Sequence, residues 1–321
     1  MKRSSLKEIA EVLKGGSYIT LYPHENMDGD ALGSTVALTK ALRILGKEAW
    51  IYYVDEIPDN LVFLDKGYVT NDKDKASKAD IAMLIDCGDP SRVGKRKDVF
   101  LMAPTTICID HHATSEATAM YNYIDPEEAA TGQLIFQLVK DLGITGDKEI
   151  GEAVYTSIIT DTGKFQYSNT QRKTHEIVAE LYDWGINPNQ VSMEIYESNR
   201  FQRMLIETIA MNNLKMSQDG KFAMAFVTRD DLVKTGAQES ETENVVGKIR
   251  SIKGVEVAAF LRENMDGRIN VSLRSKKYID VSRIAEGIGG GGHIRAAGAT
   301  LSNIGLEDAL ALIERVVKEA F

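Results

Sequence analysis

The sequence predicts an α/β protein with a parallel-sheet N-terminal domain and a smaller α/β C-terminal domain that has a mixed sheet. Short runs of apolar and β-branched residues alternate along the chain with longer segments in which apolar residues recur at helical spacing. The run at residues 81–85 is apolar throughout, which is typical of a parallel strand buried on both faces. At 321 residues the chain is long enough for two domains, each with its own core.

The expected domains are residues 1–185 and 201–321, joined by a connection at residues 186–200, where Gly185-Ile186-Asn187-Pro188 breaks a helical pattern. In the first domain we expect strands at residues 18–22, 49–54, 81–85 and 105–109, and helices at residues 31–45, 148–160 and 175–184. In the second domain we expect strands at residues 222–228, 255–262 and 270–275, and helices at residues 244–251, 281–286 and 307–320.

Composition and charge narrow the class of protein. A hydrophobic content of 43% and a charged content of 26% are those of a soluble globular protein, and no apolar run approaches the ~20 residues that span a bilayer. The only cysteines are Cys87 and Cys108, so a reducing cytoplasm is the expected compartment and no membrane partner is expected. The net charge of −9 argues against long nucleic acid as a partner, because binding it requires many phosphates to be neutralised.

The charge is unevenly distributed. Residues 1–200 contain 21 basic and 31 acidic residues, whereas residues 201–321 contain 17 and 16. The acidic half suits metal ions, which bring their own positive charge, and the second half is the better place for an anion to bind.

A histidine and two aspartates, His24, Asp28 and Asp30, lie between the expected strand at residues 18–22 and the helix that follows. In an open α/β sheet such a turn lies at the carboxyl end of the strand, where ligands bind. Taken alone, the cluster favours the simpler interpretation that the aspartates cap the helix.

Further polar residues follow later apolar segments. Asp86 ends the run at residues 81–85 and is equally well explained as a turn residue or as a ligand. The pair His111-His112 leaves another expected strand, and packing explains it less easily because the chain has five histidines in all. Asp110 is placed to hold a histidine ring N–H and so fix its tautomer. Asp161 follows the expected helix at residues 148–160.

Together these positions form a set of six potential metal ligands: His24, Asp28, Asp30, Asp86, His111 and Asp161. Four carboxylates and two imidazoles suffice for two divalent ions if one carboxylate is shared, and the mixture suits manganese better than calcium or magnesium. Two such ions close together are a known means of promoting phosphoryl displacement.

The second domain contains a glycine run, Gly289 to Gly292, followed by His293. Glycines let backbone N–H groups approach an anion closely, and a helix beginning there would add its positive end. The surrounding sequence is apolar rather than polar, so we favour phosphate binding over a flexible linker.

These motifs resemble the DHH phosphoesterase superfamily over nearly the whole chain. The segment from His24 to Asp30, then Asp86, Asp110-His111-His112 and Asp161, resembles its four motifs in order. Gly290 to His293 with Ala296-Ala297-Gly298 resembles the signature of the DHH-associated C-terminal domain. Met27 departs from the proline of many relatives, which affects the stiffness of the loop rather than ligation.

The resemblance implies roles for individual residues. One metal would be held by His24, Asp28 and Asp86, and a second by Asp30, Asp86, His111 and Asp161, as Mn²⁺ with Mg²⁺ or Co²⁺ as alternatives. Catalysis would involve Asp86, Asp110 and His112, with His112 facing the scissile phosphate. Substrate would be bound by Arg262, Arg274, Ser275, Gly290, Gly291, Gly292 and His293.

The same resemblance implies a substrate class. It points to the bacterial oligoribonuclease and pAp phosphatase group, whose substrates are short RNA, linear dinucleotides such as pApA and pGpG, and pAp. A cyclic di-AMP phosphodiesterase is the first alternative, followed by an inorganic pyrophosphatase and a non-catalytic nucleotide sensor. A homodimer is left open.

Overall fold

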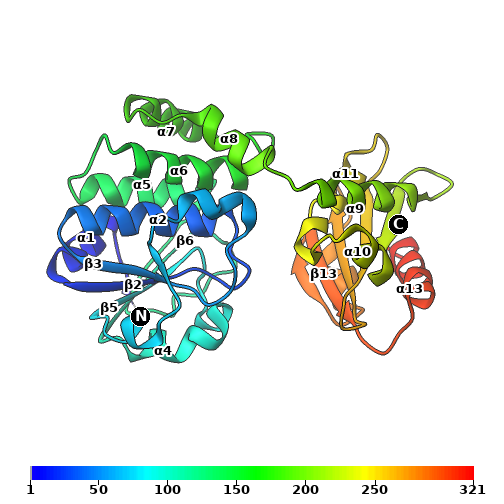
Figure 1. Ribbon diagram of the computed structural model, residues 1–321, viewed down its shortest axis with the longest axis horizontal. Helices are drawn as coiled ribbons and strands as arrows, with labels where there is room; N and C mark the ends of the chain where they lie inside the picture. Colours follow the sequence, from blue (N-terminus) through cyan, green and yellow to red (C-terminus); the bar gives the residue numbers. More distant parts are fainter. Residues whose placement is uncertain (1) are drawn as a thin grey trace. The chain divides into compact units, whose positions relative to one another are not determined.

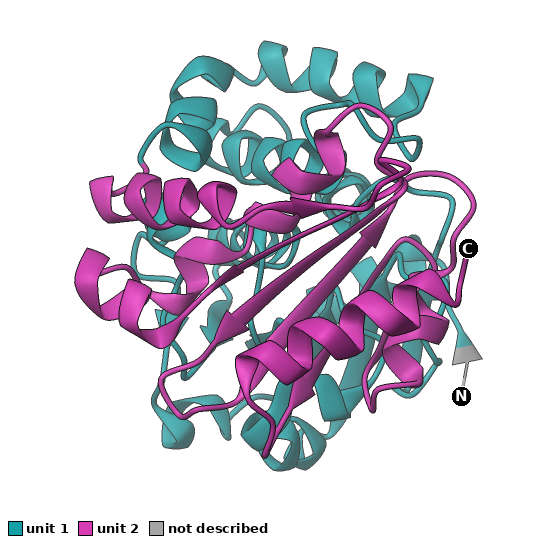
Figure 2. Ribbon diagram, turned by 90° about the vertical axis from the view of Figure 1, so that its right-hand side faces the viewer, with its two compact units in different colours: residues 1–198 teal, residues 199–321 magenta. Residues whose placement is uncertain are grey.

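A computed structural model of the protein describes residues 2–321, and the chain divides into two compact units. Unit 1 comprises residues 1–198 and unit 2 residues 199–321 (Figure 2). Within residues 2–321 no helix is both long enough and apolar enough to cross a bilayer.

Unit 1 contains a seven-stranded sheet in the order β1-β7-β6-β5-β2-β3-β4, in which every pairing is parallel. Its strands are β1 (Lys2–Arg3), β2 (Tyr18–Tyr22), β3 (Glu48–Tyr52), β4 (Val69–Thr70), β5 (Ile81–Ile85), β6 (Thr105–Asp110) and β7 (Tyr121–Ile124). From β2 the chain adds β3 and β4 on one side, and it then adds β5, β6 and β7 on the other. The predicted parallel sheet is confirmed, and the strand order reverses between β2 and β5, the place where such sheets bind ligands.

The helices of unit 1 cover both faces of this sheet. They are α1 (Leu6–Gly15), α2 (Gly29–Ile44), α3 (Lys73–Ala76), α4 (Lys97–Met102), α5 (Thr131–Asp141), α6 (Lys148–Asp161), α7 (Arg172–Asp183) and α8 (Pro188–Tyr196). Helices α2, α5 and α6 lie on one face with α7 and α8 outside them, and α4 lies on the other (Figure 1). Helix α2 is therefore enclosed, and its residues are buried from Gly29 to Thr39.

Glycines allow α2, α5 and α6 to approach one another closely. A Cβ atom added at Gly33 of α2 would lie 2.4 Å from the carbonyl oxygen of Ala153 in α6. One added at Gly132 of α5 would lie 2.0 Å from the hydroxyl oxygen of Ser157 in α6. Both distances are shorter than any real contact of a Cβ atom, so larger residues at these positions would push the helices apart.

Unit 2 contains a six-stranded mixed sheet in the order β12-β13-β11-β10-β9-β8, in which only the β9–β10 pair is parallel. Its strands are β8 (Lys215–Met216), β9 (Phe222–Val227), β10 (Val257–Glu263), β11 (Ile269–Ser275), β12 (Gly291–His293) and β13 (Ala296–Leu301). Its helices are α9 (Phe201–Asn212), α10 (Arg229–Thr235), α11 (Val245–Ser251), α12 (Val281–Glu286) and α13 (Leu306–Lys318). Helices α12 and α13 pack on one face, and α9, α10 and α11 on the other. The predicted mixed sheet is confirmed.

Two segments differ from the sequence predictions. Residues 186–200 contain helix α8, whose Val191 and Ile195 are buried in the core of unit 1. No helix follows the glycine run to add its positive end, because residues 291–293 and 296–301 form the antiparallel strands β12 and β13. This pairing requires a glycine at position 292, since a Cβ atom there would lie 2.6 Å from the carbonyl oxygen of Ala296.

Candidate metal centre

The six predicted ligands of unit 1 lie together where the strand order of the parallel sheet reverses. His24 follows β2, Asp86 follows β5 and His111 follows β6. Asp28 and Asp30 lie at the start of α2, and Asp161 is the last residue of α6. Because the carboxyl ends of parallel strands share one edge of a sheet, residues far apart in sequence meet here.

One group consists of His24, Asp28 and Asp86. The Nε2 atom of His24 lies 3.6 Å from Oδ2 of Asp86 and 3.9 Å from Oδ1 of Asp28. The capping interpretation is also correct for Asp28, because its Oδ1 accepts hydrogen bonds from the N–H groups of Asp30 and Ala31 at 3.0 Å each. The oxygen of Asp28 that caps the helix is therefore also the one that lies 3.9 Å from His24.

A second group surrounds His111. Its Nε2 atom lies 3.5 Å from Oδ2 of Asp30, 3.6 Å from Oδ2 of Asp161 and 3.8 Å from Oδ1 of Asp86. Asp86 therefore belongs to both groups and presents a different oxygen to each. This carboxylate is 1% exposed, and its backbone has a φ of 61°, a left-handed conformation that is uncommon outside glycine and often found at functional sites.

Backbone carbonyl groups fix the orientation of both histidine rings. The Nδ1 atom of His24 lies 2.6 Å from the carbonyl oxygen of Glu25, and Nδ1 of His111 lies 3.0 Å from that of Glu128. A carbonyl only accepts, so Nδ1 carries the proton and Nε2 keeps its lone pair facing the carboxylates. This is the arrangement of a metal-ligating histidine.

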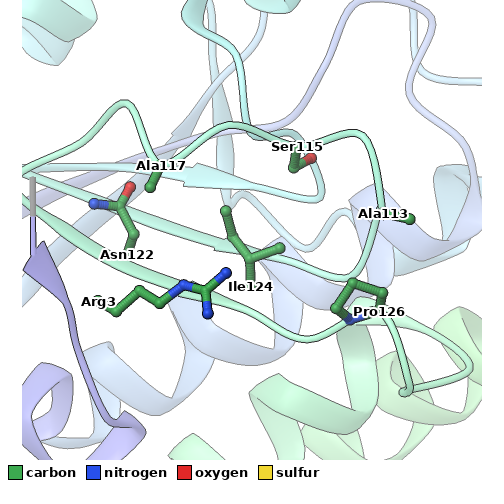
Figure 3. Close-up of a pocket in the computed structure, with 7 residues that line it drawn as sticks. All are labelled: Arg3, Ala113, Ser115, Ala117, Asn122, Ile124 and Pro126. Carbon is green, nitrogen blue, oxygen red and sulfur yellow. The ribbon is translucent and has the colours of Figure 1, made fainter.

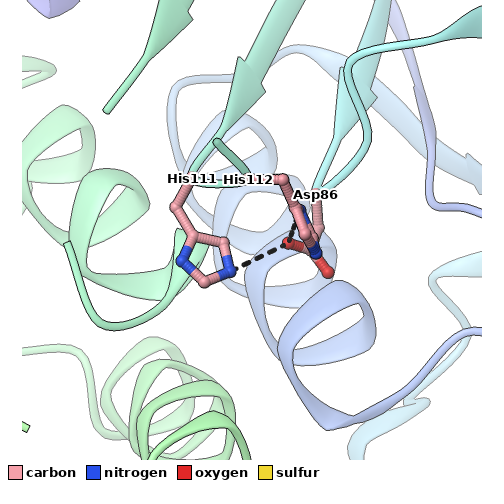
Figure 4. Close-up of side chains that lie close together, drawn as sticks. All are labelled: Asp86, His111 and His112. Atoms are coloured by element: carbon pink, nitrogen blue, oxygen red, sulfur yellow. Dashed lines mark ion pairs between the residues drawn. The ribbon is translucent and has the colours of Figure 1, made fainter. Parts of the chain in front are cut away.

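His112 is held differently, by Asp110. Its Nδ1 atom lies 2.7 Å from Oδ1 of Asp110. The same atom lies 3.7 Å from Oδ1 of Asp86 (Figure 4). Asp110 is fully buried and also accepts hydrogen bonds from the backbone N–H groups of His111 and His112 and from the hydroxyl of Ser115. The Nδ1 atom of His112 therefore donates to Asp110 and is not a metal ligand, and Asp110 orders the loop that carries both histidines.

The buried carboxylates perturb one another. Burial raises the pKa of Asp86 well above its usual value, and the neighbouring Asp30 and Asp28 raise it further. Burial and Asp30 likewise raise the pKa of Asp161 to about 7, although His111 opposes the shift. Burial lowers the pKa of His111, but Asp30 and Asp161 outweigh it, so that this pKa is raised.

These shifts predict that Mn²⁺ stabilises the protein more at pH 8 than at pH 5. Between about pH 4 and 7, Asp161 is protonated in the folded protein and ionised in the unfolded protein. Its contribution to the stability of the folded protein therefore falls as pH rises through this range. The favourable contribution of charged His111 is present below its unfolded pKa of 6.5 and is also lost as pH rises through its raised pKa. A divalent cation replaces these protons.

The measurement is the melting temperature with and without Mn²⁺ at each pH. We expect the stabilisation by Mn²⁺ to be larger at pH 8 than at pH 5 by about 1 kcal/mol or more. This corresponds to a rise in melting temperature that is larger by roughly 2–4 °C for a domain of this size. The variant Asp161→Asn should reduce the pH dependence, and an equal increase at both pH values would contradict the prediction.

The residues present fit a pair of divalent cations. Three groups of three side chains each bring their ligand atoms within 4.8 Å of one another, and each includes at least one histidine and Asp86 or Asp30. The Nε2 atoms of His24 and His111 face carboxylates, and burial together with repulsion from neighbouring carboxylates raises the pKa values of two of them, Asp86 and Asp161. A bound cation would relieve that repulsion and accept both ligand types.

Comparison with known protein families agrees with this arrangement. Residues 18–161 match the DHH family, N-terminal domain, and residues 219–319 match the DHHA1 domain. The chain is 34% identical over 323 residues to the bifunctional oligoribonuclease and PAP phosphatase NrnA of Thermus thermophilus, with 98% of this chain and 94% of the relative covered. The chain belongs to the DHH family of phosphoesterases.

Other relatives extend the comparison. The Bacillus subtilis protein of the same name is 27% identical over 306 residues, with 94% of this chain and 95% of the relative covered. An exopolyphosphatase-related protein from Bacteroides fragilis has a similar structure, with a TM-score of 0.92, 26% identity and coverage of 98% and 95%. RecJ of Thermus thermophilus, solved with Mn²⁺, shares the fold at 16% identity and a TM-score of 0.60, and the match covers 55% of that chain and 100% of this one.

Sequence reasoning missed several polar residues that support the DHH ligands. Thr131 and Ser157 both donate hydrogen bonds to carboxylates of predicted ligands, as does Ser34. Two of them could have been found by helical spacing. Ser34 is four residues after Asp30 and Ser157 four before Asp161, so each shares a helix face with a predicted ligand. Nothing near Thr131 in the sequence marks it.

In the DHHA1 domain the predicted substrate-binding arginines lie on one face of the sheet but far apart. Arg262 of β10 is paired with Asn270 of β11, and Arg274 of β11 with Ala258 of β10. Four residues of strand separate these pairs, roughly 13 Å. Arg274 lies in the same row as Ala296 and the backbone of His293, so only this arginine is level with the glycine hairpin. The side chain of His293 lies outside the described part of the structure.

Arg262 is engaged within its own domain. It donates hydrogen bonds to Asn264, Thr242 and the carbonyl oxygen of Glu239, and its Nη2 lies 3.3 Å from a carboxylate oxygen of Glu239. The residue lines a cavity of about 190 Å³. Because its guanidinium is already surrounded by acceptors, phosphate binding by Arg262 would require these partners to be exchanged.

Ser275 corrects a sequence prediction. It was expected to bind substrate beside Arg274, but adjacent residues of a strand point to opposite faces. Its side chain is buried at 1% exposure, and its hydroxyl donates to the carbonyl oxygen of Ile279 at 2.7 Å. Ser275 therefore closes a turn inside the domain and does not face a ligand.

A cavity of about 120 Å³ lies behind the loop that carries His112 (Figure 3). It is lined by Arg3, Ala113, Ser115, Ala117, Asn122, Ile124 and Pro126. It includes none of the six predicted metal ligands. Its connection with the site is Ser115, whose hydroxyl supports Asp110.

Proposed function

We propose that this protein is a metal-dependent phosphoesterase that hydrolyses short oligoribonucleotides and linear dinucleotides to 5′-mononucleotides, and pAp to AMP and phosphate. The observation that carries the proposal is Asp86, which presents one oxygen to His24 and the other to His111. A carboxylate shared in this way suits two adjacent divalent ions, and such pairs serve phosphoryl displacement. The names of the Thermus thermophilus and Bacillus subtilis relatives support the choice of substrates.

Two divalent ions, which we take to be Mn²⁺ with Mg²⁺ or Co²⁺ as alternatives, complete the proposed site. One would be held by His24, Asp28 and Asp86, and the other by Asp30, Asp86, His111 and Asp161. Bound there, they would neutralise the negative charge that develops around phosphorus. The mixture of imidazole and carboxylate ligands favours manganese.

The remaining roles fall to residues of the chain itself. His112, oriented by Asp110, would place its Nε2 atom against the scissile phosphate and stabilise the developing charge. In the DHHA1 domain, Arg274 and the backbone of Gly290, Gly291 and Gly292, with His293, would bind another phosphate group of the substrate. The same bond, from phosphorus to a ribose 3′ oxygen, is broken in pApA and in pAp, so one site serves both. We expect the enzyme to act in the cytoplasm.

The proposal is tested by turnover of pApA, pAp, cyclic di-AMP and pyrophosphate, measured side by side with Mn²⁺ and with a chelator. We expect AMP to be released from pApA and pAp, and turnover to cease when metal is removed. Asp86→Asn serves as the inactive control. Hydrolysis of pyrophosphate alone, or of none of the four, would overturn the proposal, and a preference for cyclic di-AMP would replace its substrate class.

A further inference from the structure

Thr131, the first residue of α5, connects two predicted ligands that come from different parts of the chain. Its backbone N–H donates to Oδ2 of Asp30 at 2.8 Å, and its hydroxyl donates to Oδ1 of Asp86 at 2.8 Å. The residue is fully buried. Asp30 lies 101 residues and Asp86 45 residues before it in the chain.

The N-terminus of α5 depends on Asp30. The residue preceding the helix, Ala130, has no side chain that could cap it. The N–H groups of Thr131 and Gly132 instead donate to the two oxygens of Asp30, at 2.8 and 3.1 Å. The helix thereby gains a carboxylate at its positive end, and Asp30 gains two donors that stabilise its charge.

These bonds leave Asp30 one oxygen for a cation. Its Oδ1 accepts from the N–H of Gly132 and from the hydroxyls of Ser34 at 3.0 Å and Ser157 at 2.5 Å. Three donors fill the space around that oxygen. Oδ2 accepts from Thr131 and lies 3.5 Å from Nε2 of His111, so it is the oxygen that faces the centre.

The hydroxyl of Thr131 determines how Asp86 is turned. Asp86 presents Oδ1 toward His111, and the same atom accepts from Thr131. Its Oδ2 is turned toward His24. Rotation of the carboxylate about its final side-chain bond would break the bond to Thr131, and the β-branched side chain of threonine has few alternative rotamers with which to follow.

We propose that Thr131 is a positioning residue of the metal centre, holding Asp86 so that each of its oxygens faces a different ligand group. This inference rests on the proposed function in that it takes the centre to hold two divalent ions. Thr131 itself does not contact the ions. It acts through Asp86 with its hydroxyl and through Asp30 with its backbone.

The test is the variant Thr131→Val, which removes the hydroxyl and keeps the shape and the backbone N–H. We expect its affinity for Mn²⁺, measured by calorimetry without substrate, to fall by about 10–100-fold, as for other residues that orient metal ligands. The electron paramagnetic resonance spectrum should lose the exchange coupling of two Mn²⁺ ions that share a carboxylate. With pApA as substrate, kcat should fall while KM changes by less than about threefold, because the substrate contacts are retained.

Two matched variants separate positioning from packing. Thr131→Ser restores the hydroxyl and should return Mn²⁺ affinity and coupling to within about threefold of the original protein. Thr35→Val removes another fully buried hydroxyl of the same unit, one that bonds only to the backbone carbonyls of Ala31 and Leu32, and should leave Mn²⁺ binding unchanged. If Thr131→Val does not fold, Thr131→Ala is compared by the same criteria.

The results distinguish this inference from the proposed function. Unchanged Mn²⁺ affinity and coupling in a folded Thr131→Val protein would overturn the inference while leaving the phosphoesterase intact. A second outcome would support the inference and overturn the function. In it, the original protein binds two coupled Mn²⁺ ions and Thr131→Val loses the coupling, but the original protein hydrolyses none of the substrates.

Discussion

Replacing Asp86 with asparagine is expected to abolish turnover and, at the same time, to stabilise the metal-free protein. Asparagine has the same shape but one acceptor oxygen and no charge, so it cannot serve both ligand groups. We expect a loss in kcat of more than about 10³-fold, beyond that for a single stabilising contact in a transition state. Stability should rise because burial, and in addition repulsion from Asp30 and Asp28, disfavours the charged form of Asp86 in the folded protein.

The gain in stability should depend on pH. The pKa of Asp86 is raised by folding, so the carboxyl destabilises the folded state increasingly as pH rises above its ordinary value of 3.8. Asparagine does not titrate, and its advantage should therefore be small near pH 4 and larger at pH 8. We expect about 1–2 kcal/mol at pH 8, a rise in melting temperature of roughly 2–8 °C.

The measurement is the melting temperature of both proteins in the presence of a chelator. When Mn²⁺ is added instead, we expect the order of the two melting temperatures to be reversed. The original protein should then be the more stable, because only it retains the shared carboxylate. A metal-free Asp86→Asn protein that melts below the original at pH 8 would show that the buried carboxylates do not repel one another as the structure indicates.

The same substitution at Asp110 is expected to destabilise the protein. Asp110 is as deeply buried as Asp86, but its surroundings are donors: two backbone N–H groups, the His112 ring and the Ser115 hydroxyl. Burial raises its pKa, but His112 and Ser115 outweigh it, so that this pKa is lowered. Its stabilising effect is present above pH 3.8 and is lost as pH falls. Asparagine would turn an N–H₂ group toward some of these donors.

We expect Asp110→Asn to cost about 2–3 kcal/mol, or roughly 4–12 °C in melting temperature. Turnover should fall by about 10²-fold or more, because His112 loses the acceptor that fixes its tautomer and its orientation. The matched control is Ser115→Ala, which removes one donor and should cost about 1 kcal/mol. Equal stabilities of the Asp110→Asn and original proteins at pH 7 would refute this account.

Much of this fold can be predicted from the sequence because its core strands are short runs of mostly apolar residues. The strands predicted at residues 18–22 and 81–85 coincide with β2 and β5, whose residues are almost all buried and mostly apolar or β-branched. The local structure of the glycine run could not be predicted from the sequence, for a physical reason. Glycine permits both a phosphate-binding turn and a close strand pairing, and only the partner strand β13 decides between them.

The sequence indicated the six predicted ligands, which the structure brings close together, but not the residues that support them. His24 and Asp86 stand out only as members of a set of polar residues that follow apolar segments. Thr131 does not, because threonine at the start of a helix is ordinary, and its importance comes from Asp30 and Asp86, both distant in sequence. The distance between Arg262 and Arg274 could not be predicted either. It depends on the register between β10 and β11, which the sequence does not specify.

The order in which the chain reaches this centre has a consequence for its synthesis. The first contributing side chain is His24 and the last is Asp161, at the end of α6. A ribosome releases the N-terminal segment first, and domains fold as they emerge. Until α6 has emerged, the growing chain lacks a predicted ligand of the second group and the serine that holds Asp30. A nascent or truncated product that ends before α6 therefore cannot assemble the complete set of predicted ligands.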